Sequence, residues 1–315
     1  MKFSTPVPLY PEKEQLSYHS NILLFGSCFS NHIGNKLHYY KFKSLSNPFG
    51  IVFQPPALEK LIVRAIDEIS FTKEDLFFLN ERWHCFETHS QCSSTDATVM
   101  LERLNTSLKV THNFLRTSSH IIITLGTAWV YRHLETDAWV ANCHKVPQKK
   151  FAKELLSVVE IKESLEAIVS LIRLVNPKVQ LIFTVSPVRH LKDGFVENQR
   201  SKAHLIAAVH ELVAPGKHQH YFPAYELMMD ELRDYRFYAE DMIHPNQTAI
   251  NFIWEQFQKV WIAEETSSTM KTVASIQAGL AHKPFDLNSV AHLDFKTQLQ
   301  EKINTLTKAY PFIKF

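Results

Sequence analysis

The sequence predicts an α/β protein in which a doubly wound parallel sheet is flanked by helices and followed by a C-terminal helical appendage. Short apolar runs of strand length alternate with longer segments in which apolar residues recur at helical spacing. Glycine and polar residues stand directly after several of the apolar runs, at the expected strand ends. Ligands of such sheets bind outside the carboxyl ends of the strands, so a functional site is expected there.

The N-terminal part of the chain has the rhythm of a βαβ unit. Residues 21–25 and 42–45 are runs typical of strands, and residues 29–40 between them predict a helix. Asn47-Pro48-Phe49-Gly50 then predicts a turn. Residues 57–69 place their apolar side chains on one helical face, which indicates the next helix.

The middle of the chain predicts an insertion, a helix, a strand and a hairpin. Residues 71–94 are polar and irregular, which favours an insertion over one face. Residues 95–115 predict a long helix, and residues 120–125 predict a buried strand that ends at Gly126. Residues 128–132 and 138–142 are expected to pair as a β-hairpin because the segment between them is turn-like.

The next part of the chain continues the alternation. Ser157 and Glu160 have the spacing of a capping box, which starts a helix that Pro177 stops. The further strands and helices are expected at residues 179–185, 196–213, 219–222, 224–232 and 248–264.

The chain is expected to divide into a domain over residues 1–265 and a helical segment over residues 266–315. A break is expected at residues 266–269, and a second interruption near Pro284. The helical segment has apolar side chains that would pack back on the domain or on a partner, namely Leu280, Leu287, Leu293 and Phe295.

Composition and charge argue against several classes of protein. The chain has 315 residues, 45% hydrophobic and 21% charged, so it can bury a sizeable core. Its net charge of +2, from 34 Lys+Arg and 32 Asp+Glu, gives no electrostatic basis for binding nucleic acid. No apolar run is long enough to span a bilayer. Residues 1–16 have no apolar signal-peptide core, so a cytoplasmic location with four free thiols is expected.

A candidate nucleophile follows the first expected strand, in Gly26-Ser27-Cys28-Phe29. Cys28 would lie at a helix N-terminus, where free N–H groups and the helix dipole stabilise an anion and lower the pKa of a thiol. Ser27 beside it would need a base to become nucleophilic. The alternative is that Cys28 is a small buried residue with a purely structural role.

A candidate base stands far downstream, in Asp241-Met242-Ile243-His244-Pro245. Three-residue spacing on a loop lets the Asp241 carboxylate reach Nδ1 of His244, which fixes the tautomer and supports an imidazolium. The alternative is an ordinary surface pair near a helix start.

A metal site is the competing interpretation of a third cluster. His84, Cys85, His89 and Cys92 lie within nine residues and could supply four zinc ligands. The spacing of two cysteines two to four residues apart is absent, however, and the neighbouring aromatic residues indicate half-buried packing. No metal site is therefore predicted.

The Asp241-to-Pro245 segment before the last helix of an α/β domain resembles the terminal block of the SGNH/GDSL hydrolase superfamily, whose nucleophile follows the first strand in a Gly-Asp-Ser motif. More closely, the chain resembles the GSCFA family, which is named for its N-terminal motif. The resemblance spans roughly residues 1–265 and implies a flavodoxin-like, SGNH-hydrolase-like fold. The segments that carry it are Phe25-Gly26-Ser27-Cys28-Phe29-Ser30, Asn47-Pro48-Phe49-Gly50, Thr124-Leu125-Gly126-Thr127-Ala128-Trp129, Asn142-Cys143-His144-Lys145-Val146-Pro147, Ser186-Pro187-Val188 and Arg233-Asp234-Tyr235-Arg236-Phe237-Tyr238.

The resemblance also assigns positions. Laid on Gly-Asp-Ser, Gly26 matches the glycine, Ser27 the aspartate and Cys28 the nucleophilic serine. Ser30 stands where the family name has alanine.

The superfamily's oxyanion-hole asparagine, two residues after a glycine, is missing, because Thr127 and Ala128 follow Gly126 here. Asn142 and His144 are candidates for the missing donor, or else turn residues whose side chains are satisfied locally. The backbone N–H groups of Cys28 and Gly50 are candidates for the other donors.

Residues and resemblance together predict a hydrolase or acyltransferase that acts on a small-molecule or glycan acyl ester or thioester and needs no cofactor. Cys28 would be the nucleophile, His244 the base and Asp241 its orienter. A thioester intermediate favours transfer to an acceptor over hydrolysis. Two alternatives stay open: an esterase centred on Ser27, and a non-catalytic small-molecule or carbohydrate-binding domain that keeps the fold.

Overall fold

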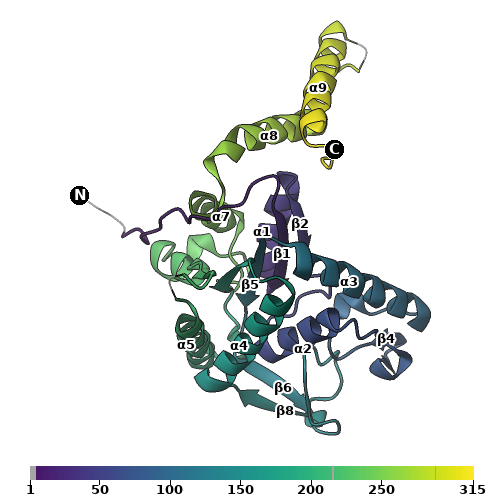
Figure 1. Cartoon of the computed structure of the whole chain (residues 1–315), viewed down its shortest axis with the longest axis vertical. Coiled ribbons are helices and arrows are strands. Elements are labelled where there is room, and N and C mark those ends of the chain that lie inside the picture. The colour runs from purple at the N-terminus through teal and green to yellow at the C-terminus, as the bar shows by residue number, and fades with distance from the viewer. Residues whose placement is uncertain (1–4, 215, 288) are drawn as a thin grey trace.

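A five-stranded, entirely parallel sheet forms the centre of the computed structural model, which describes residues 5–214, 216–287 and 289–315 (Figure 1). The strands run in the order β10-β9-β5-β1-β2, so the sheet grows outward in both directions from β1 and β5. Their bounds are β1 Asn21–Gly26, β2 Lys43–Ser46, β5 His120–Leu125, β9 Gln180–Val185 and β10 Gln219–Tyr221. The predicted doubly wound α/β architecture is confirmed.

Helices cover both faces of the sheet. On one face, Ile22, Leu24 and Ile122 pack against α1 (Cys28–Tyr39) and α7 (Gln247–Trp261). The alternate residues of the same strands pack against four helices on the other face, namely α2 Pro55–Ile66, α3 Ala97–Thr117, α4 Val158–Val175 and α5 Phe195–Leu212. Because both faces are covered, the central strands are continuous apolar runs, as is typical of parallel sheets.

Side-chain caps fix where the helices begin. Ser157 accepts from the backbone N–H of Glu160 while the Glu160 carboxylate accepts from the N–H of Ser157, so the predicted capping box is present. The side chains of Ser27, Asp96 and Asn246 cap α1, α3 and α7 by accepting from backbone N–H groups of the first turn.

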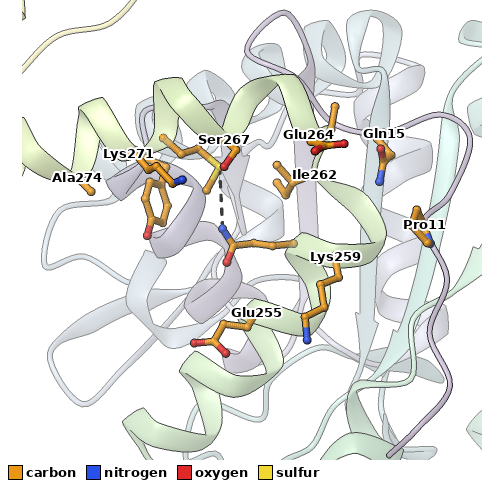
Figure 2. A pocket seen from close by; sticks show the side chains of 13 residues that line it. Pro11, Gln15, Glu255, Lys259, Ile262, Glu264, Ser267, Lys271 and Ala274 are labelled. Carbon is orange, nitrogen blue, oxygen red and sulfur yellow. Dashed lines mark hydrogen bonds between the residues drawn. The ribbon is translucent and has the colours of Figure 1, made fainter.

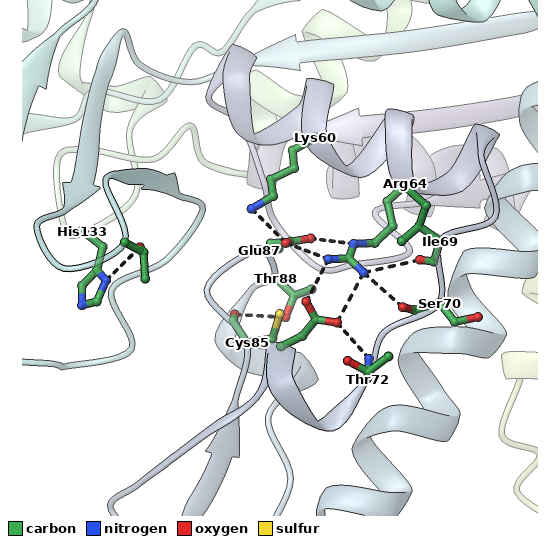
Figure 3. A network of polar contacts seen from close by, with 11 residues as sticks. Lys60, Arg64, Ile69, Ser70, Thr72, Cys85, Glu87, Thr88 and His133 are labelled. Atoms are coloured by element: carbon green, nitrogen blue, oxygen red, sulfur yellow. Dashed lines mark hydrogen bonds and ion pairs between the residues drawn. The ribbon is translucent and has the colours of Figure 1, made fainter.

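The insertion over residues 71–94 contains a small hairpin of β3 (Phe77–Leu79) and β4 (Arg82–His84). Figure 3 shows how Arg64 of α2 holds it: the guanidinium contacts the carboxylates of Glu87 and Asp75, each at 2.9 Å, and the carbonyls of Ile69 and Ser70. This half-buried network ties the insertion to the helical layer.

A second small sheet follows β5. The predicted hairpin is present as β6 (Trp129–His133) and β7 (Ala138–Val140), which pair antiparallel. Strand β8 (Phe151–Leu155), which was not predicted, pairs with the other edge of β6.

The chain after β10 is helical and irregular. It contains α6 (Ala224–Glu226), a π-helical turn at Leu227–Glu231, α8 (Ser267–Ala281) and α9 (Val290–Ala309). Short 3₁₀ turns occur at Lys73–Asp75, Ser90–Cys92, Gln148–Lys150, Leu191–Asp193, Tyr235–Phe237 and Glu264–Thr266. None of the helices in the described ranges has the length and apolar character needed to cross a membrane.

Helices α8 and α9 lie beyond α7, away from the sheet (Figure 1). Leu280, Leu287, Leu293 and Phe295 are exposed, so they do not pack on the domain. The alternative, that they pack on a partner, stays a prediction. The end of the segment packs instead: Leu306 and Ile313 are buried, and the Tyr310 ring lies 5.0 Å from that of Tyr18.

Candidate functional site

The turn between β1 and α1 lies at the carboxyl edge of the sheet and depends on Gly26. This residue has a φ of 130°, and a Cβ added to it would lie 2.1 Å from the carbonyl oxygen of Thr124 on β5. Its N–H donates to Oδ1 of Asn47, in the turn after β2, at 2.8 Å. Only glycine allows β1 to turn into α1 this close to β5.

Ser27 is fully engaged in holding this turn. Its side chain is buried, caps α1 by accepting from the N–H of Phe29 at 3.2 Å, and donates to Oγ of Ser186 at 2.9 Å. Ser186 directly follows β9, so the contact links the ends of two strands. These contacts give Ser27 a structural role.

Cys28 is the first residue of α1 and is partly exposed. Burial raises the pKa of its thiol, whereas the N–H groups of Cys28 and Phe29 and the Lys202 ammonium act in the opposite direction. The prediction of a lowered pKa is therefore wrong, because desolvation outweighs the helix terminus.

The other three thiols are further from ionisation. Burial raises the pKa of Cys85 to about 12, and the pKa values of Cys92 and Cys143 to about 11. The rise at Cys28 is smaller. All four cysteines are free thiols.

Asp241 and His244 form the pair that their spacing predicts. Oδ2 of Asp241 lies 2.6 Å from Nδ1 of His244, and its Oδ1 accepts from the N–H groups of Ile243 and His244. The hydrogen bonds from the His244 backbone and side chain lower the pKa of Asp241 to about 2. Both side chains are a little under half exposed, so His244 is accessible from solvent.

The loop that carries this pair is braced by Arg189, which follows β9. The Arg189 guanidinium donates to the carbonyl of Met242 and lies 4.3 Å from the Tyr238 ring centre. Met242 has a φ of 55°, a left-handed conformation that costs free energy and persists only where the surroundings enforce it.

The charges of this loop act on the start of α1, which places the two segments near each other. The charge of Asp241 contributes to the raised pKa of Cys28. The pKa of His32 is lowered mainly by burial and to a smaller extent by the charge of His244. His32 stands four residues after Cys28 on α1, so both lie on one helical face. Within the described residues no hydrogen bond joins Cys28 to His244 itself.

Two of the glycines predicted to bind the oxyanion or the substrate already use their backbone N–H groups within the protein. The N–H of Gly50 donates to the carbonyl of Asn47, and that of Gly126 donates to the carbonyl of Phe53. The Phe53 ring also lies against Gly126, where an added Cβ would be 2.6 Å away.

Asn142 and His144 belong to a different cluster. Oδ1 of Asn142 accepts from the N–H of His144, as in a local turn. The His144 ring is buried against Phe77 and Phe86, and its Nε2 lies 2.8 Å from the carbonyl oxygen of Cys85. Burial lowers the pKa of His144 to about 4, so the ring is neutral near pH 7. Both residues contact the loop over residues 85–89.

The histidines that were considered as zinc ligands are hydrogen-bonded to other protein groups. Nδ1 of His84 lies 2.7 Å from Oγ of Ser93, and His89 accepts from the N–H of Gln91. Across the part of the chain that the structure describes, no three His, Cys, Asp or Glu side chains are arranged to hold a metal ion.

Sequence reasoning missed Lys202 and His190, which face the same edge. Lys202 is completely buried, and burial lowers the pKa of His190 to about 3. Lys202 could have been detected, because it falls within the apolar stripe of α5 together with Leu205 and Val209. His190 stands in a loop, and no local pattern marks it.

Large hollows occur elsewhere on the molecule. Figure 2 shows one of about 620 Å³ between α7 and α8, lined by Glu255, Lys259 and Lys271 among others. It lies at the C-terminal end of α7, whereas His244 precedes the N-terminus of this 15-residue helix, a separation of about 22 Å along the axis. A smaller hollow of about 200 Å³, lined by Arg189 and Tyr238, adjoins the His244 loop.

Comparison with known proteins identifies sequence relatives at the family level. The sequence profile of the GSCFA family matches residues 21–257, and that of the GSCFA domain protein, C-terminal domain, matches residues 273–315. No curated protein sequence matches the chain significantly.

Two solved structures show distant similarity. A carbohydrate esterase family 3 from Talaromyces cellulolyticus is 8% identical, with a TM-score of 0.37, over 80% of this chain and 98% of its own. An acetyl xylan esterase from the rumen bacterium Butyrivibrio proteoclasticus is 10% identical, with a TM-score of 0.39, over 81% of this chain and 65% of its own.

Proposed function

The chain belongs to the GSCFA family, and we propose that it is an acyl-transferring or acyl-hydrolysing enzyme of the SGNH type in which Cys28 is the nucleophile. The observation that carries this proposal is the hydrogen-bonded Asp241–His244 pair on a loop that faces the start of α1. A nucleophile, a base and a group that orients the base are the parts of covalent acyl transfer.

The surroundings of the Ser27 hydroxyl and the Cys28 thiol favour Cys28 as the nucleophile. Ser27 is buried and bonded to both Phe29 and Ser186, so its activation would break the cap of α1. Cys28 is partly exposed, and the hydrogen bonds that act on its thiol come from the backbone N–H groups of Cys28 and Phe29.

In the proposed reaction the Cys28 sulfur attacks the acyl carbonyl carbon while His244 takes up the thiol proton. The bond from the carbonyl carbon to the leaving alcohol or thiol then breaks, and His244 returns the proton to the leaving group. The resulting thioester is attacked by water, in hydrolysis, or by an acceptor hydroxyl or amine, in transfer. Formation of the Cys28–His244 contact requires substrate, as is common for catalytic hydrogen bonds that tighten only in the complex.

Two donors support the developing oxyanion in this proposal. The backbone N–H of Cys28 is the first N–H of α1 and accordingly has no intrahelical acceptor. Asn31, one turn further along α1, is held by Nδ2 of Asn47, which donates to its Oδ1 at 2.7 Å. This contact leaves the Asn31 amide nitrogen as the second donor, in place of the missing asparagine after Gly126.

A panel of acyl esters and acyl thioesters, offered to the wild type and to Cys28→Ala, His244→Ala and Cys143→Ala, tests the proposal. Turnover should be lost in the first two variants, by on the order of 10²–10⁴-fold for the histidine, and kept in the third. Folded Cys28→Ala and His244→Ala proteins with wild-type turnover would refute it. A ligand bound without turnover in any variant would indicate the non-catalytic alternative.

A further inference from the structure

A small hollow beside the His244 loop is lined by two arginines and two tyrosines among others, namely Arg189, Arg233, Tyr235 and Tyr238. One wall of the hollow is the π-helical turn Leu227–Glu231, a rare conformation that is frequent at functional sites. The volume of about 200 Å³ is below the roughly 300–1,000 Å³ of pockets that enclose a whole ligand. The hollow therefore fits one group of a larger substrate.

Arg189 ties this hollow to the loop that carries the proposed base. Its backbone N–H donates to the carbonyl of Ile243 at 3.2 Å, and its guanidinium donates to the carbonyl of Met242. These carbonyls belong to the two residues before His244. A group bound at Arg189 would therefore lie next to the base.

The guanidinium of Arg189 has more donors than its contacts within the protein use. A guanidinium carries five N–H groups, and the side-chain hydrogen bond that Arg189 forms with the described residues is the one to Met242. Its Nε is buried without an acceptor among those residues, although buried donors are normally paired. The rings of Tyr238, Tyr235 and Phe195 are centred 4.3, 5.3 and 5.9 Å from the guanidinium carbon and stabilise the positive charge in this place.

The charges that line the hollow favour an anion. Neither Arg189 nor Arg233 forms an ion pair with any residue that the structure describes. Asp234 also lines the hollow, but its carboxylate accepts from the N–H of Arg236 at 2.8 Å and lies 3.0 Å from the Arg236 guanidinium. The flat, forked guanidinium matches the oxygens of a carboxylate or a phosphate, so an anionic group complements the hollow.

We propose that Arg189, together with Arg233, binds a carboxylate or phosphate group carried by the leaving alcohol or thiol of the acyl substrate. In the proposed reaction His244 returns its proton to the leaving group, so the leaving group must lie beside the loop that Arg189 braces. The acyl carbon lies at Cys28 instead. The assignment to the leaving group rests on the proposed function, whereas anion binding at Arg189 does not.

Matched pairs of acetyl thioesters test where the anion lies. S-acetyl mercaptopropionate and S-acetyl mercaptoethyl phosphate carry an anion on the leaving thiol, and S-acetyl mercaptopropionamide and S-acetyl mercaptoethanol are their neutral counterparts. For the wild type, kcat/KM should be about tenfold higher for the anion of at least one pair, mainly through a lower KM, because charge-assisted hydrogen bonds form with the anion alone.

Arg189→Gln should bring this ratio close to one, and Arg233→Gln should lower it. Comparing the two members of a pair within one variant separates substrate recognition from a loosened His244 loop, which would slow both members equally. The matched control is Arg200→Gln, which removes an exposed arginine of α5 and should keep the wild-type ratio.

A wild type that is indifferent to charge in both pairs would overturn the proposal, and so would an undiminished ratio in a folded Arg189→Gln protein. S-ethyl thiosuccinate and its amide place the charge difference on the acyl side. A preference for the anion that is confined to this last pair would contradict the leaving-group assignment.

Anion binding can also be measured without turnover, in the full chain carrying Cys28→Ala. The buried Nε–H of Arg189 can be identified in ¹H–¹⁵N spectra by its absence when Arg189→Lys is added. This signal should shift saturably with propionate or methyl phosphate and stay in place with neutral propionamide. A signal that responds to neither anion would contradict the proposal.

The outcomes separate this proposal from the proposed function. If the Arg189 signal responds to an anion but no thioester is turned over, the anion site stands and the enzymatic function fails. If turnover needs Cys28 and His244 while charged and neutral thioesters are equally good substrates, the function stands and the anion site fails.

Discussion

Ser27 and Cys28 are neighbours in the chain but have different environments. Ser27 caps α1 and joins Ser186, whereas Cys28 begins the helix with its thiol partly exposed. The sequence could show that both residues stand at the turn. It could not show which side chain is bonded, because the partner of Ser27 comes from the distant strand β9.

Ser27→Ala should destabilise the protein while keeping Cys28 reactive. Loss of an N-cap side chain typically costs about 1 kcal/mol of unfolding free energy. Denaturant unfolding measures this cost, and iodoacetamide labelling measures the thiol. A variant with unchanged stability would show that the cap contributes nothing, and complete loss of Cys28 labelling in a folded variant would contradict the separate roles.

Asp241 gives the site a predictable pH dependence. Its pKa falls from an ordinary 3.8 to about 2 because His244 and the backbone hydrogen-bond its ionised form. The stabilisation is therefore complete above about pH 4 and is lost as the pH falls toward 2. The difference in melting temperature between wild type and Asp241→Asn should shrink over this range. Asp294→Asn, at an exposed position on α9, is the control, and a pH-independent difference for Asp241→Asn would contradict the account.

At the scale of elements, most strands and helices follow from local pattern, and the exceptions have physical reasons. The three inner strands of the central sheet, β1, β5 and β9, are apolar runs because both faces are buried. Strand β8 escaped prediction because Lys153 and Glu154 interrupt its apolar pattern at the edge of a small, half-exposed sheet. The raised pKa of Cys28 also could not be predicted, because it reflects burial of the thiol in the folded chain.

In the elements that carry the site, local contacts could likewise be predicted from the sequence, whereas contacts between distant segments could not. The spacing of Asp241 and His244 predicts their contact, because it is local. The bracing of their loop by Arg189 is not local, and neither is the burial of Lys202 beneath the strand ends. Lys202 was nevertheless visible as a charged residue in the apolar stripe of α5.

The β1–α1 turn should tolerate no side chain at Gly26. Gly26→Ala meets both a positive φ and the backbone of Thr124, which cannot move without displacing β5. A loss of more than about 3 kcal/mol, or failure to fold, is expected from denaturant unfolding. Gly194→Ala is the matched control, because its φ is 98° with open space around it, and strain alone should cost about 1–3 kcal/mol. Equal losses would show that the close approach to β5 is unimportant.

At the scale of the whole molecule, α8 packs on the domain through Met270, Val273 and Ile276, and α9 is anchored through the chain end that follows it. Gln277 of α8 donates to the carbonyl of Tyr39, and the chain end packs through Tyr310 and Ile313. The intervening region has exposed apolar side chains such as Phe285 and Leu287.

Ile313→Ala should loosen this segment, because truncation of a buried aliphatic side chain typically costs about 2–4 kcal/mol. Hydrogen exchange of the α9 amides should accelerate while that of β1 and β5 stays slow. Phe285→Ala, at a fully exposed position, is the control and should exchange like the wild type. Unchanged exchange in Ile313→Ala would mean that the chain end does not anchor α9.

The central claim is that Cys28 carries the acyl group during turnover. Rapid acid quenching of the protein with an activated acyl ester or thioester, followed by peptide mass mapping, tests it most directly. The account predicts one acyl adduct, on the sulfur of Cys28, that is absent from Cys28→Ala and cleared slowly in His244→Ala. An adduct on Ser27, or turnover that persists in Cys28→Ala, would contradict it.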